Sequence, residues 1–295
     1  MPLLRAGAAL AAVAVLAACG SAPAPRPAGP SVVASTDVYG AVAKAVGGDT
    51  VQVTSLIRSA AADPHEYEAT PADTLAVSRA TVLISNGGGY DDFAGKLLDA
   101  ASTKPISVVA TALSGYATDA PDFNEHVWYD LPTMKKLADH LANSLGTADQ
   151  PNATRYLDNA KKFDAQVDGL MTKVAAIKAK HAGAKVAITE PVPGCHLAAA
   201  GLVVVTPPEF SEAVEEGTDP PAAVVTANNA TFTAAEVLVE NAQTAGPTTT
   251  QAEQAAAANG VPVVKVTETL PDGVTDYVVW MSGQVDALAA ALDAS

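Results

Sequence analysis

The period of apolar and polar positions alternates between two values along the chain. From residue 31 to residue 109, short apolar runs are separated by stretches in which apolar residues recur every three or four positions. The first pattern is typical of β-strands and the second of amphipathic helices. Together they predict strands at 32–34, 51–57, 81–85 and 106–109, and helices at 38–46, from 71 onward and at 90–101. Strands separated by helices indicate a parallel sheet covered on both faces.

Residues 151–181 keep a helical period without interruption. Apolar residues recur at alternating steps of four and three: Tyr156, Ala160, Phe163, Val167, Leu170, Val174 and Ile177. Pro151 suits a first helical turn, and Gly183 lies just past the end. A two-helix hairpin is the alternative, but only Gly169 offers a break and no turn residues surround it. We therefore expect one helix about 45 Å long.

The alternation of strands and helices returns after this long helix. The pattern predicts strands at 185–189, 202–206 and 261–267, helices at 194–200 and 251–258, and a last helix with Leu288 and Leu292 facing inward. Residues 207–221 are acidic and rich in proline, which predicts a loop.

The expected fold class is α/β, with two (β/α) lobes whose sheets are parallel, joined by one long rigid helix. The expected boundaries are an N-terminal lobe at 31–148, the linking helix at 149–182 and a C-terminal lobe at 183–295. In such sheets, ligand-binding groups gather in loops at the carboxyl ends of the strands.

Residues 1–18 are expected to be a signal peptide rather than part of the fold. Arg5 precedes an apolar run that is too short to cross a bilayer as a permanent helix, and small residues lead from it to Cys19. This pattern resembles a bacterial lipoprotein signal, in which Cys19 carries the lipid; an ordinary secretory signal is the alternative. Residues 19–30 contain four prolines among small residues, which predicts an extended tether.

Charge and cysteine content narrow the function classes. The formal net charge of −15 argues against nucleic acid and anionic lipid surfaces as partners and is compatible with cations. With Cys19 assigned to lipid, Cys195 has no disulfide partner and is expected to be a small buried residue. Aromatic residues make up only 5% of the chain, which disfavours a receptor that stacks on sugars.

Two of the five histidines lie in similar acidic and aromatic settings. His65 lies within residues 63–68 (DPHEYE), and His126 lies within residues 124–130 (NEHVWYD). Imidazoles on loops with acidic neighbours indicate a metal site. Asp130 is expected to cap the helix that follows, although it could instead orient an imidazole.

Two glutamates could complete such a site. Glu190 and Glu268 each follow a predicted strand, so both would emerge where a cleft is expected. Two imidazoles and two carboxylates would neutralise a divalent ion within a mixed nitrogen and oxygen shell. The pair Cys195 and His196 is not expected to be catalytic, because adjacent residues on a helix point about 100° apart.

The whole mature chain resembles the metal-specific solute-binding lipoproteins of bacterial ABC importers (cluster A-I, solute-binding protein family 9). The resemblance is carried by the two histidine motifs above and by residues 70–73 (TPAD), 83–87 (LISNG), 189–190 (TE) and 200–202 (AGL). It implies two α/β lobes joined by one helix, with a single ion in the interlobe cleft. Its implied ligands are His65, His126, Glu190 and Glu268.

The resemblance also bears on the choice of ion. Members that prefer zinc commonly have histidine at the third ligand position, whereas members that prefer manganese have glutamate, as here. The fourth ligand is most often aspartate, so Glu268 departs from the pattern. The histidine-rich loop of many zinc-specific members is missing, since residues 114–124 contain no histidine.

The function implied is a monomeric lipoprotein on the outer face of the cell membrane. It would capture Mn²⁺ or Zn²⁺ and deliver the ion to the membrane permease of an ABC transporter. A metal-dependent hydrolase is a rival, but its ion needs an open coordination position and a base. All four candidate side chains are better used as ligands, and the sequence has no HExxH helix. A surface adhesion lipoprotein is a further alternative, to which no residue points.

Overall fold

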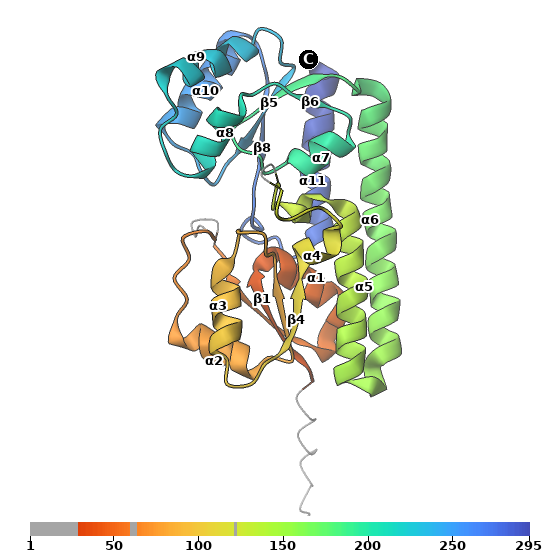
Figure 1. The fold of residues 1–295 in the computed structure, drawn as a ribbon. Helices are drawn as coiled ribbons and strands as arrows, with labels where there is room; N and C mark the ends of the chain where they lie inside the picture. Colours follow the sequence, from red (N-terminus) through yellow and green to blue (C-terminus); the bar gives the residue numbers. More distant parts are fainter. Residues whose placement is uncertain (1–28, 60–63, 121–122) are drawn as a thin grey trace, which may run out of the picture.

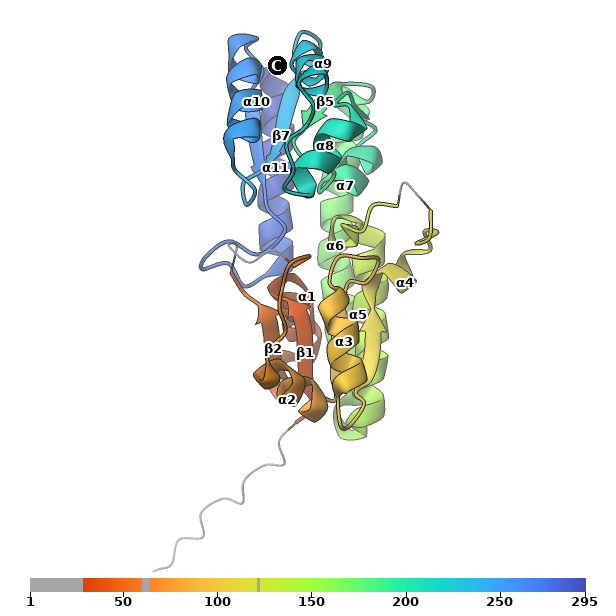
Figure 2. The same cartoon turned by 60° about the vertical axis from the view of Figure 1, so that its left-hand side comes forward.

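The computed structural model describes residues 29–59, 64–120 and 123–295. The expected signal peptide and Cys19 lie outside these ranges. Figures 1 and 2 show two lobes arranged one above the other along a long helix. Among the described residues, no helix is both long and apolar enough to span a bilayer.

A four-stranded parallel sheet forms the first lobe. Its strands are β1 (Ser31–Thr36), β2 (Gln52–Ile57), β3 (Val82–Ser85) and β4 (Ile106–Val109), in the order β2-β1-β3-β4. The helices that follow these strands are α1 (Asp37–Gly47), α2 (Pro71–Arg79), α3 (Asp92–Ala100) and α4 (Ala110–Ser114). The predicted strands and helices are confirmed to within a few residues.

Helices cover both faces of this sheet because alternate strand residues point to opposite sides. Val32 and Ala34 of β1 belong to the main apolar cluster, which also includes residues of α1 and of α5 (Leu131–Ala148). Val33 belongs to a second cluster, together with Val77 of α2 and Phe93 of α3. The sheet is therefore buried between two helical layers, as the sequence predicts.

The second lobe repeats this strand order. Its strands are β5 (Lys185–Ile188), β6 (Val203–Val204), β7 (Val237–Asn241) and β8 (Val263–Val266), all parallel, in the order β6-β5-β7-β8. Its helices are α7 (Gly194–Ala199), α8 (Pro208–Glu215), α9 (Ala222–Thr231), α10 (Pro247–Ala258) and α11 (Tyr277–Ala294). The two lobes thus have the same topology.

The prediction of a loop at residues 207–221 is wrong. Residues 208–215 form α8, with Pro208 in its first turn, where the missing N–H of proline costs no hydrogen bond. Phe210 and Val214 lie one turn apart on this helix, and both are buried. The buried apolar face stabilises a helix here despite the high content of proline and acidic residues.

A single helix, α6 (Ala153–His181), joins the lobes, as predicted. Each of the seven apolar residues that define its period is buried. The chain reaches α6 through α5, whose N-terminus is capped by Asp130: its carboxylate accepts a hydrogen bond from the backbone N–H of Thr133, 3.2 Å away.

The C-terminal helix α11 returns along α6 (Figure 1). Lys173 of α6 donates a 2.7 Å hydrogen bond to Asp286 of α11, and His181 Nε2 lies 2.8 Å from Asp293. Leu288 and Leu292 are buried, as predicted. Two long helices therefore brace the two lobes on one side.

Candidate metal centre

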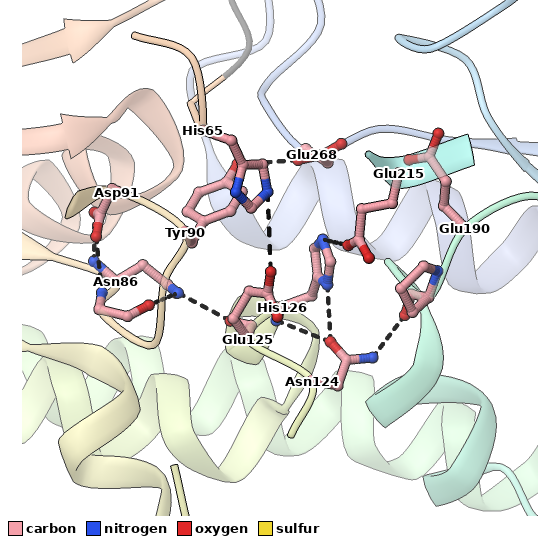
Figure 3. A network of polar contacts seen from close by, with 12 residues as sticks. His65, Asn86, Tyr90, Asp91, Asn124, Glu125, His126, Glu190, Glu215 and Glu268 are labelled. Carbon is pink, nitrogen blue, oxygen red and sulfur yellow. Dashed lines mark hydrogen bonds and ion pairs between the residues drawn. The ribbon is translucent and has the colours of Figure 1, made fainter. Parts of the chain in front are cut away.

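The four predicted ligands all follow strands or lie in loops between the two lobes (Figure 3). His65 lies in the loop after β2, and His126 immediately precedes the short 3-10 helix η2 (Val127–Tyr129). Glu190 follows β5, and Glu268 follows β8. Hydrogen bonds from the first lobe reach both glutamate segments, so the carboxyl ends of the two sheets lie opposite each other.

His126 is the most deeply buried histidine of the site, with 1% of its surface exposed. The side-chain oxygen of Asn124 lies 2.9 Å from the backbone N–H of His126 and 2.8 Å from its ring Nδ1. This contact favours the tautomer that carries its proton on Nδ1, which leaves the Nε2 lone pair directed into the cleft. Burial and the neighbouring His65 lower the pKa of His126 to about 3, so the ring is neutral and able to bind a metal.

Glu190 and Glu268 accept hydrogen bonds from the same side-chain amide group. Asn241, the last residue of β7, donates through Nδ2 to Glu190 Oε2 and to Glu268 Oε1, both at 2.7 Å. Thr244 also donates to Glu190. Because both oxygens contact one nitrogen, the two carboxylates lie in the same part of the cleft.

Tyr90 connects the two pairs of predicted ligands. Its hydroxyl donates to Glu268 Oε2 at 3.1 Å, across the boundary between the lobes. Its ring centroid lies 5.2 Å from that of His65 and 6.0 Å from that of His126. Tyr90 is fully buried, and three of the four predicted ligands lie around its side chain.

Two further glutamates enter the cleft. Glu125 Oε1 lies 3.9 Å from His65 Nε2, and Glu215 Oε1 lies 3.4 Å from His126 Nε2. Burial, together with nearby Glu125, Glu190, Glu268 and Glu212, raises the pKa of Glu215 to about 8. Crowded carboxylates of this kind repel one another, and a cation between them would relieve that repulsion.

The set with converging ligand atoms differs from the predicted four. One potential ligand atom from each of His65, Glu125 and Glu215 lies within 4.8 Å of the other two. Glu190 and Glu268 are held by Asn241 instead. The assignment of His65, His126, Glu190 and Glu268 as ligands therefore stays a prediction, although all four side chains lie in this cleft (Figure 3).

Sequence reasoning missed Tyr90, Glu125, Glu215 and Asn241 as parts of the site, and gave no role to Asn124. Three of these had a usable signal: Asn124 and Glu125 directly precede His126, and Tyr90 follows the turn of three glycines after β3. Glu215 was hidden because its segment was predicted to be a loop. Asn241 ends a strand just as Glu190 and Glu268 follow theirs, but it contributes an amide rather than a carboxylate.

A buried network holds the loop that carries His126. Asn86, which follows β3, donates through Nδ2 to the backbone carbonyl of Glu125 at 3.0 Å. Tyr39 of α1 donates to the side-chain oxygen of Asn86. Asp91 accepts hydrogen bonds from the backbone N–H groups of Asn86 and Gly87 at 2.7 and 2.8 Å. The loop is therefore fixed to the core of the first lobe.

Cys195 and His196 do not resemble a reactive pair. Cys195 is half-buried rather than fully buried, and burial raises the pKa of its thiol to about 11. The pKa of His196 is lowered to about 4, because the effect of burial exceeds the opposing effect of the nearby Tyr129 backbone. A protonated thiol is a poor nucleophile and a poor metal ligand.

The residues of the cleft fit a divalent transition metal. Two imidazoles and several carboxylates form a mixed nitrogen and oxygen set that suits manganese, iron or zinc. Hydrogen bonds orient His126, Glu190 and Glu268 from outside the ligand set, as is usual around metal sites.

Known proteins resemble the chain in both sequence and structure. The family model of the periplasmic zinc-uptake complex component A matches residues 32–291. A manganese-binding lipoprotein, MntA, of Halalkalibacterium halodurans is 27% identical over 136 residues, which cover 46% of this chain and 45% of that protein. The chain thus spans about half the length of the curated relatives that it matches.

Solved structures share the fold along nearly their whole length. The solute-binding protein FpvC of Pseudomonas aeruginosa, in complex with Mn²⁺, has a TM-score of 0.74 at 20% identity and covers 90% of this chain and 99% of its own. The periplasmic zinc-binding protein TroA of Treponema pallidum has a TM-score of 0.70 at 19% identity, with 90% and 99% covered. The predicted α/β fold of two lobes joined by one helix is confirmed.

Proposed function

We propose that this chain, which belongs to the family of the periplasmic zinc-uptake complex component A, is the solute-binding component of an ABC importer. Its cargo would be one divalent transition metal ion, Mn²⁺ or Zn²⁺. It would deliver this ion to the membrane permease of the importer. Membership in a family of uptake components favours transport over the hydrolase and adhesion alternatives.

One observation carries the proposal: the orientation of His126. Asn124 holds the Nδ1 side of the ring, and the Nε2 atom faces Glu215, an acidic residue of the other lobe. Because burial keeps the ring neutral, its Nε2 is available to a metal across the physiological pH range. A histidine with only a structural role would need no carboxylate from the opposite lobe.

The proposed ligands are His65 and His126 from the first lobe and Glu190 and Glu268 from the second. The ion would then link the two lobes, and Tyr90 would position Glu268 from the first lobe. The continuous helix α6 predicts only small lobe movement, because bending it would break backbone hydrogen bonds. Release would depend on movement of the carboxylate ligands or on force applied by the permease.

The expected lipid on Cys19 would keep the protein at the outer face of the cell membrane, close to the permease. The names of the relatives support this location, since several are lipoproteins of ABC transporters. A monomer is expected, with residues 19–30 as the tether.

Native mass spectrometry with elemental analysis tests the proposal. Protein purified without added metal is loaded with Mn²⁺ or Zn²⁺, and the bound stoichiometry is measured. We expect one ion per chain in the wild type, and none in His126→Ala at a concentration that saturates the wild type. His140→Ala is the matched control, because His140 is exposed on α5 and should leave binding unchanged. A wild type that binds neither ion, or a His126→Ala variant with full occupancy, would overturn the proposal.

A further inference from the structure

Glu215 has no place in the predicted ligand set, yet it lies beside His126 (Figure 3). It is the last residue of α8, in the second lobe, and 20% of its side chain is exposed. Its Oε1 atom is buried and has no hydrogen-bond partner among the described residues, and its contact with His126 Nε2 spans 3.4 Å. This oxygen is therefore directed at the same atom that the proposed function assigns to the metal.

The separations match those within a coordination shell. Ligands about 2.1 Å from a metal are roughly 3 to 3.5 Å apart when adjacent and just over 4 Å apart when opposite. The distance from Glu215 Oε1 to His126 Nε2 is 3.4 Å, and that from Glu125 Oε1 to His65 Nε2 is 3.9 Å. One ligand atom of Glu215 also lies within 4.8 Å of one on His65 and one on Glu125. An ion could therefore contact His126 and Glu215 together without a large movement of either side chain.

Unlike Glu215, the carboxylates of Glu190 and Glu268 are held by hydrogen bonds. Glu190 is held by Asn241 and Thr244, and Glu268 by Asn241 and Tyr90. These contacts orient carboxylates while leaving lone pairs for an ion. Glu215 Oε1 makes no such hydrogen bond, so a bound cation would give this buried atom the partner it lacks.

We propose that Glu215 is an additional ligand of the cargo ion and that it biases the site toward Mn²⁺ over Zn²⁺. This inference rests on the proposed function. Zinc is commonly satisfied by four ligands in a tetrahedral shell, which His65, His126, Glu190 and Glu268 could supply. Manganese takes more ligands and prefers carboxylate oxygen. A third carboxylate therefore adds more to Mn²⁺ binding than to Zn²⁺ binding.

Competition with a chelator of known affinity tests the role of Glu215. The dissociation constants of Mn²⁺ and Zn²⁺ are measured for the wild type, Glu215→Gln and Glu212→Gln. Glutamine keeps the shape of the side chain and removes its charge. Glu212→Gln removes the same charge from an exposed position of the same helix, so it controls for the general electrostatic attraction of cations.

In Glu215→Gln we expect Mn²⁺ binding to weaken about 10-fold or more and Zn²⁺ binding by less than about threefold. A neutral amide oxygen is a weaker ligand than a carboxylate, and the ion of higher coordination number depends more on this additional ligand. Glu212→Gln should change both constants little and equally. An unchanged ratio of the two constants in Glu215→Gln would overturn the inference, whether both constants are unaltered or both change alike. That result is distinct from failure of the proposed function, in which the wild type itself would bind neither ion.

Discussion

Asn124 offers a direct test of how the site prepares His126 for a metal. Its amide makes three polar contacts: with the backbone N–H of His126 at 2.9 Å, with the ring Nδ1 of His126 at 2.8 Å, and with the backbone carbonyl of Pro191 at 2.7 Å. The first two fix the orientation and tautomer of the ring. The third crosses to the other lobe, one residue from Glu190.

Asn124→Ala removes all three contacts. An intramolecular hydrogen bond contributes about 1 kcal/mol net, so we expect the free energy of unfolding to fall by roughly 2 to 3 kcal/mol, which leaves a protein of ordinary stability folded. Loss of an orienting partner for a ligand histidine typically lowers metal affinity about 10- to 100-fold. That range corresponds to roughly 1.4 to 2.7 kcal/mol of binding free energy.

Asn124→Asp separates the two roles of the side chain. Aspartate can still accept from the His126 ring and backbone, but it cannot donate to Pro191. We expect a metal affinity close to that of the wild type and a free energy of unfolding closer to that of Asn124→Ala. Isothermal titration calorimetry gives the affinity, and urea unfolding gives the stability. Asn143→Ala, which removes an exposed side-chain amide from α5, is the matched control.

Two results would refute this reasoning. If Asn124→Ala bound the ion as tightly as the wild type, orientation of His126 would not limit affinity. If Asn124→Asp bound as weakly as Asn124→Ala, the contact with Pro191 rather than the contact with the histidine would set the affinity.

Two further predictions concern Tyr90 and His196. Tyr90→Phe removes the hydroxyl that donates to Glu268 but keeps the ring, so metal affinity should fall about 10-fold or more while thermal stability changes little. Tyr116→Phe, in an exposed tyrosine, is the control, and equal metal affinity in the two variants would contradict the prediction. Burial lowers the pKa of His196 from 6.5 to about 4, so its neutral form stabilises the fold above pH 6.5, and that stability is lost as the pH falls through 4. Between pH 7 and pH 4.5, the free energy of unfolding of the wild type, measured by urea titration, should therefore fall by about 2 to 3 kcal/mol more than that of His196→Leu. If the free energy of unfolding depended on pH in the same way in both proteins, His196 would not contribute.

The fold was predictable wherever one face of an element is uniformly apolar. The period of the long helix identified α6 because Tyr156, Phe163 and Ile177 lie on the single face that packs against the protein. Two elements were harder. Strand β6 contains only Val203 and Val204, because the register with β5 covers these two residues alone of the predicted strand. Helix α8 is short, and its acidic residues concealed the spacing of Phe210 and Val214.

The site was predictable only in part, for a different reason. Residues at the ends of strands or in loops between them can be assigned to the cleft from the chain order alone. The contacts that refine the site join segments far apart in the sequence, such as Tyr90 and Glu268, which are separated by 178 residues. Such contacts depend on the relative position of two lobes and on side-chain orientation, neither of which follows from a local pattern.

The interlobe hydrogen bonds favour the proposed release of the ion by movement of side chains over release by movement of the lobes. Asn124 contacts the carbonyl of Pro191, next to Glu190, and the hydroxyl of Tyr129 lies 2.7 Å from the carbonyl of Thr267, next to Glu268. Each contact thus joins the segment of His126 to a segment that carries a predicted carboxylate ligand. Rotation of one lobe against the other would break both contacts, displace the ligands together and bend α6. Rotation about the side-chain bonds of the glutamates breaks neither contact, so the proposed exchange of the ion requires no movement of the backbone around His126.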